Sequence, residues 1–248
     1  MTERTIAVIP ARYGSSRFPG KPLAMIAGKS MIQRCYESTC KCDDFAEVLV
    51  ATDDMRIFDH VRGFGGNVVM TSPNHPTGTD RIAEAIADRD ADLIVNVQGD
   101  EPLMSAEVLH RLVVAMRTSG ADMGTAAVPF DVLDGVDPAS ENNVKVVVDR
   151  RGFALYFSRA LIPFHRQGGT AVTPMLHWGL YAYKRSFLTQ FVTWPQGALE
   201  SCEKLEQLRA LENGASIMVI TAKERSVGVD TPEDLAIVED IVRRTEGK

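Results

Sequence analysis

Residues 6–23 read IAVIPARYGSSRFPGKPL, a short apolar run followed by a loop rich in glycine, serine and basic residues. The run Ile6–Ile9 predicts a buried β-strand. The loop after it carries two glycines, two serines, two arginines and one lysine. Glycines let backbone N–H groups approach phosphate oxygens, and the basic side chains neutralise phosphate charge. We therefore expect a phosphate-binding loop at the carboxyl end of a first strand, the edge where open α/β sheets bind ligands.

The loop differs from the two common phosphate-binding motifs. It has neither the G-x-x-x-x-G-K-[ST] spacing of a Walker A loop nor the G-x-G-x-x-G of a dinucleotide fold. Arginine and glycine are also common in ordinary surface loops, which is the structural alternative. The density of basic residues directly after a strand favours the phosphate-binding interpretation.

The composition is that of a globular protein with an apolar core, because 45% of the residues are hydrophobic. The formal net charge of −6 argues against general nucleic-acid binding, which needs a basic face. No run approaches the roughly 18 apolar residues of a membrane span. Met1–Arg4 lead into the first strand without a signal-peptide pattern. We expect a cytoplasmic protein that binds a small anionic ligand and has no membrane or nucleic-acid partner.

The cysteines lack the C-x-x-C spacing of a metal or redox motif. They are Cys35, Cys40, Cys42 and Cys202. We expect all four to be reduced thiols.

Strand and helix patterns alternate through the first half of the chain. Strands are expected at 6–9, 48–51, 67–70 and 93–97, and helices at 31–40, 55–64, 79–87 and 105–116. This alternation predicts an α/β fold with a mostly parallel sheet and helices on both faces. The second half is β-rich, with strands expected at 144–148, 153–157, 179–183 and 217–220 and one helix at 203–212. A last helix begins after Thr231, with Pro232 at its first position.

Two aspartates are candidate magnesium ligands. Asp100 follows the strand at 93–97, so it should lie on the same sheet edge as the cationic loop. Magnesium prefers one or two carboxylates together with phosphate oxygens and water. Asp230, just before the last helix, could complete such a site. Both residues are equally consistent with ordinary turn positions.

The segment Pro76–Arg81 follows the third strand and lies on the same edge. Its hydroxyl side chains and glycine at a helix start could contact a base or a ribose. The same residues also make a common helix-capping sequence, so this segment alone indicates little.

Several motifs taken in order resemble the 3-deoxy-manno-octulosonate cytidylyltransferases, also called CMP-Kdo synthetases. The resemblance extends from Ile6 to about Ile237. It rests on residues 10–23, 50–54, 77–81, 96–102, 154–159, 179–183, 205–209 and 228–235. It implies the nucleotide-diphospho-sugar transferase fold as a single domain over residues 1–248. It also implies a magnesium-dependent reaction in which CTP and the sugar acid Kdo give CMP-Kdo and pyrophosphate for lipopolysaccharide synthesis.

The resemblance also implies roles for individual residues. The catalytic residues would be Arg12, Arg17, Lys21 and Asp100, with Lys21 and Arg17 stabilising charge on the phosphorus and on the departing pyrophosphate. The CTP-binding residues would be Ala11, Arg12, Ser15, Lys21, Thr77, Gly78, Thr79 and Asp80. The metal ligands would be Asp100 and Asp230. The sugar pocket would hold Arg81, Gln98, Arg159, His177, Tyr181, Glu203 and Gln207.

Spacing and charge bear on the sugar pocket independently. Arg159 could bind the sugar carboxylate, or it could form a surface ion pair. Glu203 and Gln207 are four residues apart, so on one helix they would share a face, although a solvated face is the alternative. His177 and Tyr181 are four apart in a strand and should point the same way, either into a pocket or into ordinary packing.

The chain departs from the family beside His177. Leu176 stands where a basic residue is frequent, and Trp178 stands where a small aliphatic residue is frequent, so the sugar pocket is more apolar than the family pattern implies. The family also implies a homodimer formed through a β-rich segment at about 150–185, with residues 153–157 and 173–183 at the interface.

Other functions remain open on the sequence alone. The sugar could be the 8-amino analogue of Kdo or another sugar acid such as a sialic acid. A non-catalytic nucleotide-binding protein is a different class, but the complete set of charged residues argues against it. A sugar transferase would carry a D-x-D motif, which Asp100-Glu101-Pro102 does not supply.

Overall fold

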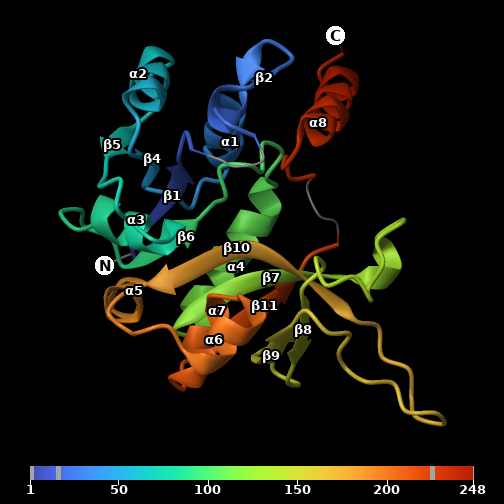
Figure 1. The fold of residues 1–248 in the computed structure, drawn as a ribbon. Coiled ribbons are helices and arrows are strands. Elements are labelled where there is room, and N and C mark those ends of the chain that lie inside the picture. Colours follow the sequence, from blue (N-terminus) through green and yellow to red (C-terminus); the bar gives the residue numbers. More distant parts are fainter. Residues whose placement is uncertain (1–2, 15–17, 224–226, 248) are drawn as a thin grey trace. The chain divides into compact units, whose positions relative to one another are not determined.

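The computed structural model describes residues 3–14, 18–223 and 227–247 (Figure 1). Ser15 and Arg17, predicted to bind phosphate, lie outside the described residues. The chain forms two compact units, residues 1–110 with 226–248, and residues 111–225. The division falls within helix α4 (Ala106–Ser119).

The first unit contains a four-stranded parallel sheet in the order β6-β1-β4-β5. Its strands are β1 (Thr5–Ala11), β4 (Glu47–Thr52), β5 (Val68–Met70) and β6 (Leu93–Asn96). The first residues of β1 are fully buried, from Ile6 to Ile9, as expected for a strand covered on both faces. The predicted parallel sheet is confirmed.

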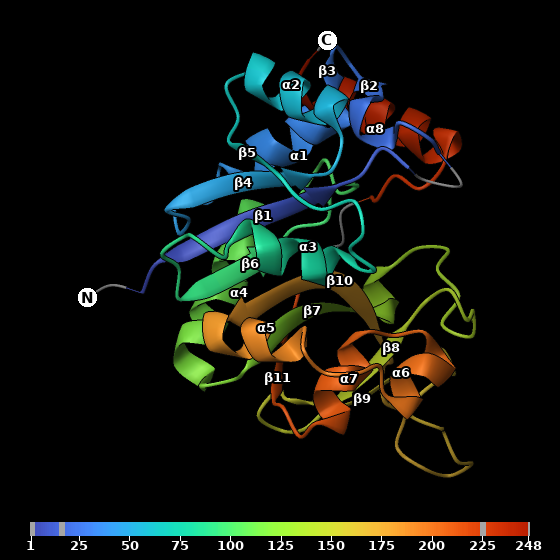
Figure 2. The same cartoon turned by 60° about the vertical axis from the view of Figure 1, so that its left-hand side comes forward.

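Helices connect these strands (Figure 2). They are α1 (Met31–Thr39), α2 (Met55–Gly63) and α3 (Gly78–Ala85). From β1 the chain passes outward to β4 and β5, and then returns through α3 to β6 on the other side of β1. Because parallel crossovers are right-handed, this reversal places α3 on the face opposite α1 and α2. Ligands bind at such a reversal point, outside the carboxyl ends of β1 and β6.

Side-chain caps fix where these helices begin. The Ser30 hydroxyl accepts a hydrogen bond from Gln33 N, and the Asp54 carboxylate accepts one from Arg56 N. Helix α3 begins one residue earlier than predicted, because the Thr77 hydroxyl accepts from Asp80 N and acts as the cap.

Three elements complete the first unit. A 3₁₀ turn, η1 (Lys21–Leu23), is followed by a hairpin of β2 (Met25–Ile26) and β3 (Lys29–Ser30) that the sequence did not predict. The last helix, α8 (Pro232–Thr245), begins with Thr231 as its cap and Pro232 at its first position, as predicted. The buried Arg34 joins hairpin and helix, since its guanidinium donates to Ile26 O, Ala27 O and the Glu246 carboxylate.

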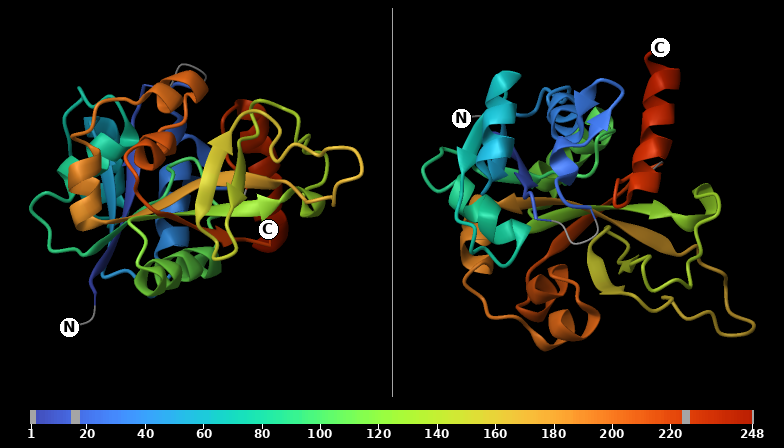
Figure 3. Two further views of the ribbon diagram at one scale, coloured as in Figure 1. Left: turned by 90° about the horizontal axis from the view of Figure 1, so that it is seen from below. Right: turned by 45° about the horizontal axis from the view of Figure 1, so that its top comes forward.

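The second unit is β-rich, as predicted, and its strands pair mainly antiparallel (Figure 3). Its strands are β7 (Met123–Pro129), β8 (Lys145–Val148), β9 (Ala154–Ser158), β10 (Met175–Lys184) and β11 (Ile217–Thr221). β7 lies between β11 and β10, and it runs parallel to β11 and antiparallel to β10. β8 pairs with β10 on one side and with β9 on the other. A short 3₁₀ turn, η2 (Phe130–Val132), follows β7, and α5 (Arg185–Phe191) follows β10.

The predicted single helix at 203–212 is wrong. The structure has two short helices, α6 (Ala198–Glu203) and α7 (Gln207–Glu212), separated by Lys204 in the left-handed conformation with φ 54°. The Lys204 N–H donates to Glu200 O and closes α6. Glu203 and Gln207 therefore do not share one helix face, and the i, i+4 argument for that pair fails.

Among the described residues, no helix is both long and apolar enough to span a bilayer.

Candidate active site

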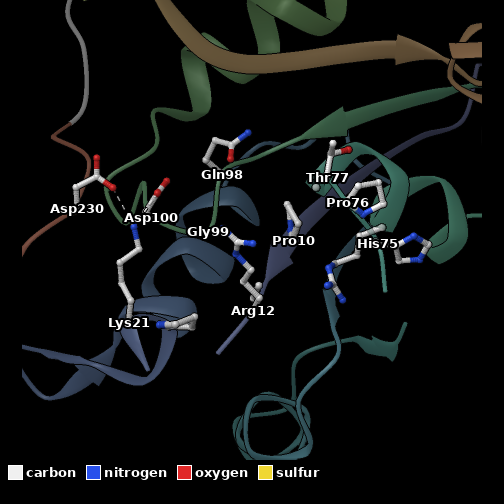
Figure 4. Close-up of a pocket in the computed structure, with 14 residues that line it drawn as sticks. Pro10, Arg12, Lys21, His75, Pro76, Thr77, Gln98, Gly99, Asp100 and Asp230 are labelled. Carbon is white, nitrogen blue, oxygen red and sulfur yellow. Dashed lines mark hydrogen bonds and ion pairs between the residues drawn. The ribbon is translucent and has the colours of Figure 1, made fainter. Parts of the chain in front are cut away.

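A cavity of about 350 Å³ opens in the first unit at the carboxyl ends of β1 and β6 (Figure 4). Its lining comes from the end of β1 and the loop and 3₁₀ turn after it, from the start of α3 and the residues before it, and from the segments after β6 and before α8. The residues are Pro10, Ala11, Arg12, Lys21, Pro22, His75, Pro76, Thr77, Gly78, Arg81, Gln98, Gly99, Asp100 and Asp230. The cavity thus lies where the reversal of strand order predicts a ligand site.

Lys21 connects three segments at one end of this cavity. Its ammonium donates to the Asp100 carboxylate at 2.8 Å, to the Asp230 carboxylate at 3.3 Å and to Val229 O at 2.7 Å. The lysine side chain is 13% exposed, whereas the two carboxylates are 35% and 49% exposed. The structure therefore brings the two predicted metal ligands together around the half-buried ammonium of Lys21, and both carboxylates stay partly exposed.

The segment carrying Asp100 is held closely against β1. A Cβ atom on Gly99 would lie 2.8 Å from Pro10 O, so only glycine fits without backbone movement. The buried Cys35 thiol donates to Gly99 O at 3.4 Å, and Val229 N–H donates to Asp100 O at 2.9 Å. These contacts fix the Asp100 backbone on both sides.

Arg12 lies between the two ends of the cavity (Figure 4). Its side chain is exposed, and no ion pair to it occurs within the part of the chain that the structure describes. Ala11, directly before it, is buried in the lining. Arg12 is thus available for an anionic ligand.

The other end of the cavity is formed by the segment that begins α3. Thr77 and Gly78 line it, whereas Thr79 is buried and Asp80 is bound to Thr77 through a hydrogen bond from the hydroxyl at 2.7 Å. Arg81 lines the cavity but is otherwise buried.

The contacts of Arg81 are structural. Its guanidinium donates to the Asp53 carboxylate at 2.7 Å and to the Thr71 hydroxyl at 2.5 Å.

His75, which the sequence analysis did not single out, also lines the cavity and pairs with Glu84. The hydrogen bond between His75 and the Glu84 carboxylate is the main cause that lowers the pKa of Glu84 below its ordinary value. No sequence motif marked His75, because it precedes the capping sequence.

The residues at the Lys21 end suit a hard divalent cation. No group of three or more candidate metal-ligating side chains occurs in residues 3–14, 18–223 and 227–247. A site that uses two carboxylates and takes its remaining ligands from substrate phosphates and water needs no third side chain. Asp100 and Asp230 fit this pattern, because both contact the same lysine and both remain partly exposed.

A second cavity, of about 330 Å³, lies within the second unit. It is lined by Asn142, Val144, Leu176, His177, Gly179, Tyr181, Lys204, Leu205, Glu206 and Gln207. The Gln207 side chain is 3% exposed, and its Nε2 is the buried side-chain nitrogen that lacks a hydrogen-bond partner among the described residues. A buried donor without a partner is costly, so this amide is suited to a ligand oxygen.

Two of the predicted sugar-binding side chains support this cavity. The Tyr181 hydroxyl donates to Gln207 Oε1 at 3.3 Å, and burial raises the pKa of Tyr181 well above its ordinary value. The His177 Nε2 lies 3.0 Å from the Thr125 hydroxyl, and its ring is 5.6 Å from that of Tyr181. The sequence predicted only a shared strand face for His177 and Tyr181; both do line this cavity, and the register of β10 shifts between Trp178 and Tyr181.

Arg159 and Glu203 do not line this cavity. The Glu203 carboxylate accepts from the Ser158 hydroxyl and from Arg159 N, and the Arg159 guanidinium donates to Glu203 O and Glu141 O. Glu206, which the sequence analysis did not select, lines the cavity instead. The break at Lys204 explains the difference, because it rotates the residues after it away from the direction that a continuous helix would give them.

Sequence comparison identifies the protein family. The pattern of the cytidylyltransferase family matches residues 6–219. The chain belongs to the cytidylyltransferase family. Among its relatives in this family is the 3-deoxy-manno-octulosonate cytidylyltransferase of Syntrophotalea carbinolica, 54% identical over 246 aligned residues that cover 96% of this chain and 98% of the relative.

Two further relatives differ in the sugar that their names specify. The Geobacter sulfurreducens protein, 49% identical, is a 3-deoxy-manno-octulosonate cytidylyltransferase, and the alignment covers 92% of this chain and 95% of the relative. The Shewanella sediminis protein, 48% identical, is an 8-amino-3,8-dideoxy-manno-octulosonate cytidylyltransferase, with 94% and 96% covered.

Solved structures of cytidylyltransferases agree with this assignment. A CMP:2-keto-3-deoxy-manno-octonic acid synthetase complexed with CTP is 40% identical, with a TM-score of 0.93 over 98% of this chain and 100% of that chain. A 4-diphosphocytidyl-2C-methyl-D-erythritol synthase from Anaerococcus prevotii shares the fold, at 14% identity and a TM-score of 0.62, with 98% of this chain and 97% of that chain covered. The predicted fold class and family are confirmed.

Proposed function

We propose that this cytidylyltransferase transfers CMP from CTP to the anomeric hydroxyl of 3-deoxy-manno-octulosonate, giving CMP-Kdo and pyrophosphate. The observation that carries the proposal is the Lys21–Asp100–Asp230 arrangement in a cavity that also presents Arg12. It combines two hard carboxylate oxygens with two cations, which is the side-chain chemistry that a metal–triphosphate site needs. The relatives with the same activity in their names supply the sugar.

The reaction exchanges one phosphorus–oxygen bond for another. The anomeric oxygen forms a bond to the α-phosphorus, and the bond from that phosphorus to the bridging oxygen of the β-phosphate breaks. The hydroxyl proton is lost to solvent, and the electron pair leaves with pyrophosphate. Catalysis in such transfers comes mainly from positioning and from stabilising charge, so fixed cations matter most.

Lys21 meets this requirement, and Arg12 adds a second, exposed cation. Lys21 is held in place by three hydrogen bonds, so its charge needs little reorganisation as negative charge develops on the leaving oxygens. Arg12 offers a planar guanidinium that can bind two phosphate oxygens at once. Ala11, Thr77 and Gly78 also line the cavity and would contact the nucleoside.

Asp100 and Asp230 would hold a magnesium ion. When bound with CTP, the ion neutralises phosphate charge and orients the triphosphate. The two aspartates lie on separate chain segments that the Lys21 ammonium holds together.

The sugar would bind beside Nε2 of Gln207, the amide nitrogen that lacks a hydrogen-bond partner among the described residues. Around that amide lie the ring nitrogens of His177, the hydroxyl of Tyr181 and the carboxylate of Glu206. This set of polar groups suits a polyhydroxylated acid. The 8-amino analogue is the second candidate substrate, since the Shewanella sediminis relative is named for it. The prediction that Arg159, Arg81 and Gln98 contact the sugar remains part of this proposal, and of these Arg81 and Gln98 line the first cavity.

We also propose that the protein is a cytoplasmic homodimer joined through its second unit. The support is a set of exposed apolar side chains on β9 and on the loop that follows it; Figures 1 and 3 show the course of this loop. Leu155 is 62% exposed, Phe164 87% and Val172 63%. Among the described strands β9 pairs with β8 alone, and Phe153, just before it, forms an isolated bridge to Met218. Light scattering of the purified protein tests the dimer, and Phe164→Asp should convert it to a monomer.

Pyrophosphate release tests the proposed activity. The protein would be assayed with CTP, magnesium and one sugar acid at a time: Kdo, its 8-amino analogue or a sialic acid. The proposal predicts turnover with Kdo above that with the other two. Fast turnover with the analogue alone would reassign the substrate. CTP binding without turnover on any of the three would contradict the enzymatic proposal.

A further inference from the structure

A backbone hydrogen bond closes the neck of the cationic loop after β1, between Tyr13 and Gly20. Gly20 N–H donates to Tyr13 O at 3.0 Å, directly after Arg12 and directly before Lys21. Arg12 and Lys21, the two cations that line the first cavity, are therefore the immediate neighbours of the two residues that this hydrogen bond joins. Whatever fixes Tyr13 against Gly20 also fixes the spacing between Arg12 and Lys21.

The Tyr13 ring packs against the backbone of Gly20. Gly20 has φ +74°, and a Cβ atom placed on it would lie 3.1 Å from both Cζ and Oη of Tyr13. A side chain at this position would be strained by the backbone angle and crowded by the ring. The phenol thus fills the space beside Gly20 that a side chain would otherwise occupy, and the two residues contact through both backbone and ring.

Tyr13 is in turn anchored by a residue of the neighbouring helix. The guanidinium carbon of Arg56 lies 3.3 Å from the centre of the Tyr13 ring, a stacked cation–π contact. The same guanidinium donates from Nε to Asp54 Oδ1 at 2.9 Å and from one terminal nitrogen to Asp54 Oδ2 at 2.6 Å. This fork holds the guanidinium plane in one orientation, and the hydrogen bonds from Arg56 lower the pKa of Asp54.

Asp54 itself is fixed at the end of the sheet. It is the cap of α2, it follows β4 after one residue, and its N–H donates to the Thr52 hydroxyl at 3.2 Å. β4 pairs with β1 up to Ala11 and Thr52. The sequence of contacts Asp54–Arg56–Tyr13–Gly20 therefore connects the rigid end of β4 to the neck of the cationic loop.

We propose that Tyr13 and Arg56 are positioning residues for the triphosphate, because their stack sets the separation of Arg12 and Lys21. Neither residue lines the cavity, so they act through the two cations and not by touching the substrate. The proposal rests on the proposed CTP-dependent function. It goes beyond that function by assigning a role to Arg56, an exposed arginine on α2 that no motif of the sequence analysis includes.

The stack and the simple charge of Arg56 make different predictions. Arg56→Ala removes both, Arg56→Lys keeps the charge but loses the planar stack and fork, and Tyr13→Ala removes the ring. If the stack matters, all three raise the Kd for CTP by about two- to five-fold, the range expected for one partly exposed cation–π contact. Tyr13→Phe keeps the ring and should bind CTP like the unmodified protein.

The matched control is Arg62→Ala. Arg62 is an exposed arginine on the same helix, and its guanidinium lies over the Phe58 ring at 6.0 Å, away from the loop neck. This variant should leave the Kd for CTP unchanged. The Tyr13→Ala/Arg56→Ala double variant should bind CTP no more weakly than Tyr13→Ala, because Tyr13→Ala already removes the stack with Arg56.

CTP binding would be measured by calorimetry, with urea unfolding of each variant to show that it is folded. Failure of the unmodified protein to bind CTP would count against the proposed function itself. If that protein binds CTP but Arg56→Lys binds equally well, charge alone explains Arg56 and the positioning proposal is overturned. Additive effects in the double variant would overturn it as well.

Discussion

Replacing Lys21 with methionine should damage catalysis far more than stability. Methionine keeps the length and the apolar stem of the side chain but removes the ammonium. That ammonium makes hydrogen bonds to Asp100, Asp230 and Val229 O. Each charge-assisted bond contributes about 1.5–3 kcal/mol when buried. Because the carboxylates are 35% and 49% exposed, water offsets much of this, and we expect a loss of about 2 kcal/mol in the free energy of unfolding.

The kinetic effect should be larger. A fixed cation that meets charge only as it develops contributes a factor of about 10²–10³ to kcat. We therefore predict that kcat falls by about this factor in Lys21→Met, with a smaller change in the KM for CTP. Lys29→Met is the control, since Lys29 forms a surface ion pair with Glu37 in the same unit and its side chain is 42% exposed. It should change neither kcat nor the KM.

Magnesium gives a second readout that does not depend on turnover. Without the lysine, Asp100 and Asp230 lose the cation that they share, so added magnesium should raise the unfolding temperature of Lys21→Met more than that of the unmodified protein. Stopped-flow pyrophosphate assays and thermal unfolding with and without magnesium measure both effects. The reasoning is refuted if kcat stays within about three-fold of the unmodified value, or if magnesium stabilises the two proteins equally.

Three other changes have expected outcomes. Gly99→Ala should lower the free energy of unfolding by about 1–3 kcal/mol and remove most of the turnover, because its Cβ would lie 2.8 Å from a backbone carbonyl oxygen of β1. Urea unfolding measures the stability and kcat the turnover. Unchanged values of both would contradict the close packing of Gly99 against β1. Ala27→Gly should stabilise by about 0.5–1 kcal/mol, because Ala27 has φ 45°, and a lower denaturation midpoint would count against it. Burial alone would raise the pKa of Asp122, but hydrogen bonds from Ser216 more than offset this and hold it below 3.8. The free energy of unfolding of the unmodified protein should therefore exceed that of Asp122→Asn by a constant amount from about pH 8 to pH 5, and this difference should shrink as the pH falls below about 4. A difference that grows in acid would show that the pKa of Asp122 is not lowered.

The first unit was predictable because its signals are local. The fully apolar run Ile6–Ile9 indicated a strand buried on both faces, and Ser30 and Thr231 indicated helix starts that the structure confirms. Lys21 and Asp100 were placed together by the rule that parallel strands end at one edge, and their ammonium and carboxylate are 2.8 Å apart.

The second unit was harder to predict because its geometry depends on positions that carry no local signal. Lys204 adopts a left-handed conformation that sequence patterns assign to glycine or asparagine, so the break between α6 and α7 was missed. Glu206 was overlooked for the same reason. β7 was missed as well, since its residues are small and apolar and its burial depends on partners distant in the chain.

Product analysis in a single turnover tests the central claim most directly. Enzyme in excess over CTP would be mixed with Kdo and magnesium, and the products followed by phosphorus NMR and mass spectrometry. The account predicts one equivalent each of CMP-Kdo and pyrophosphate, formed together. Consumption of CTP that yields CMP or CDP without a nucleotide-linked sugar would contradict it.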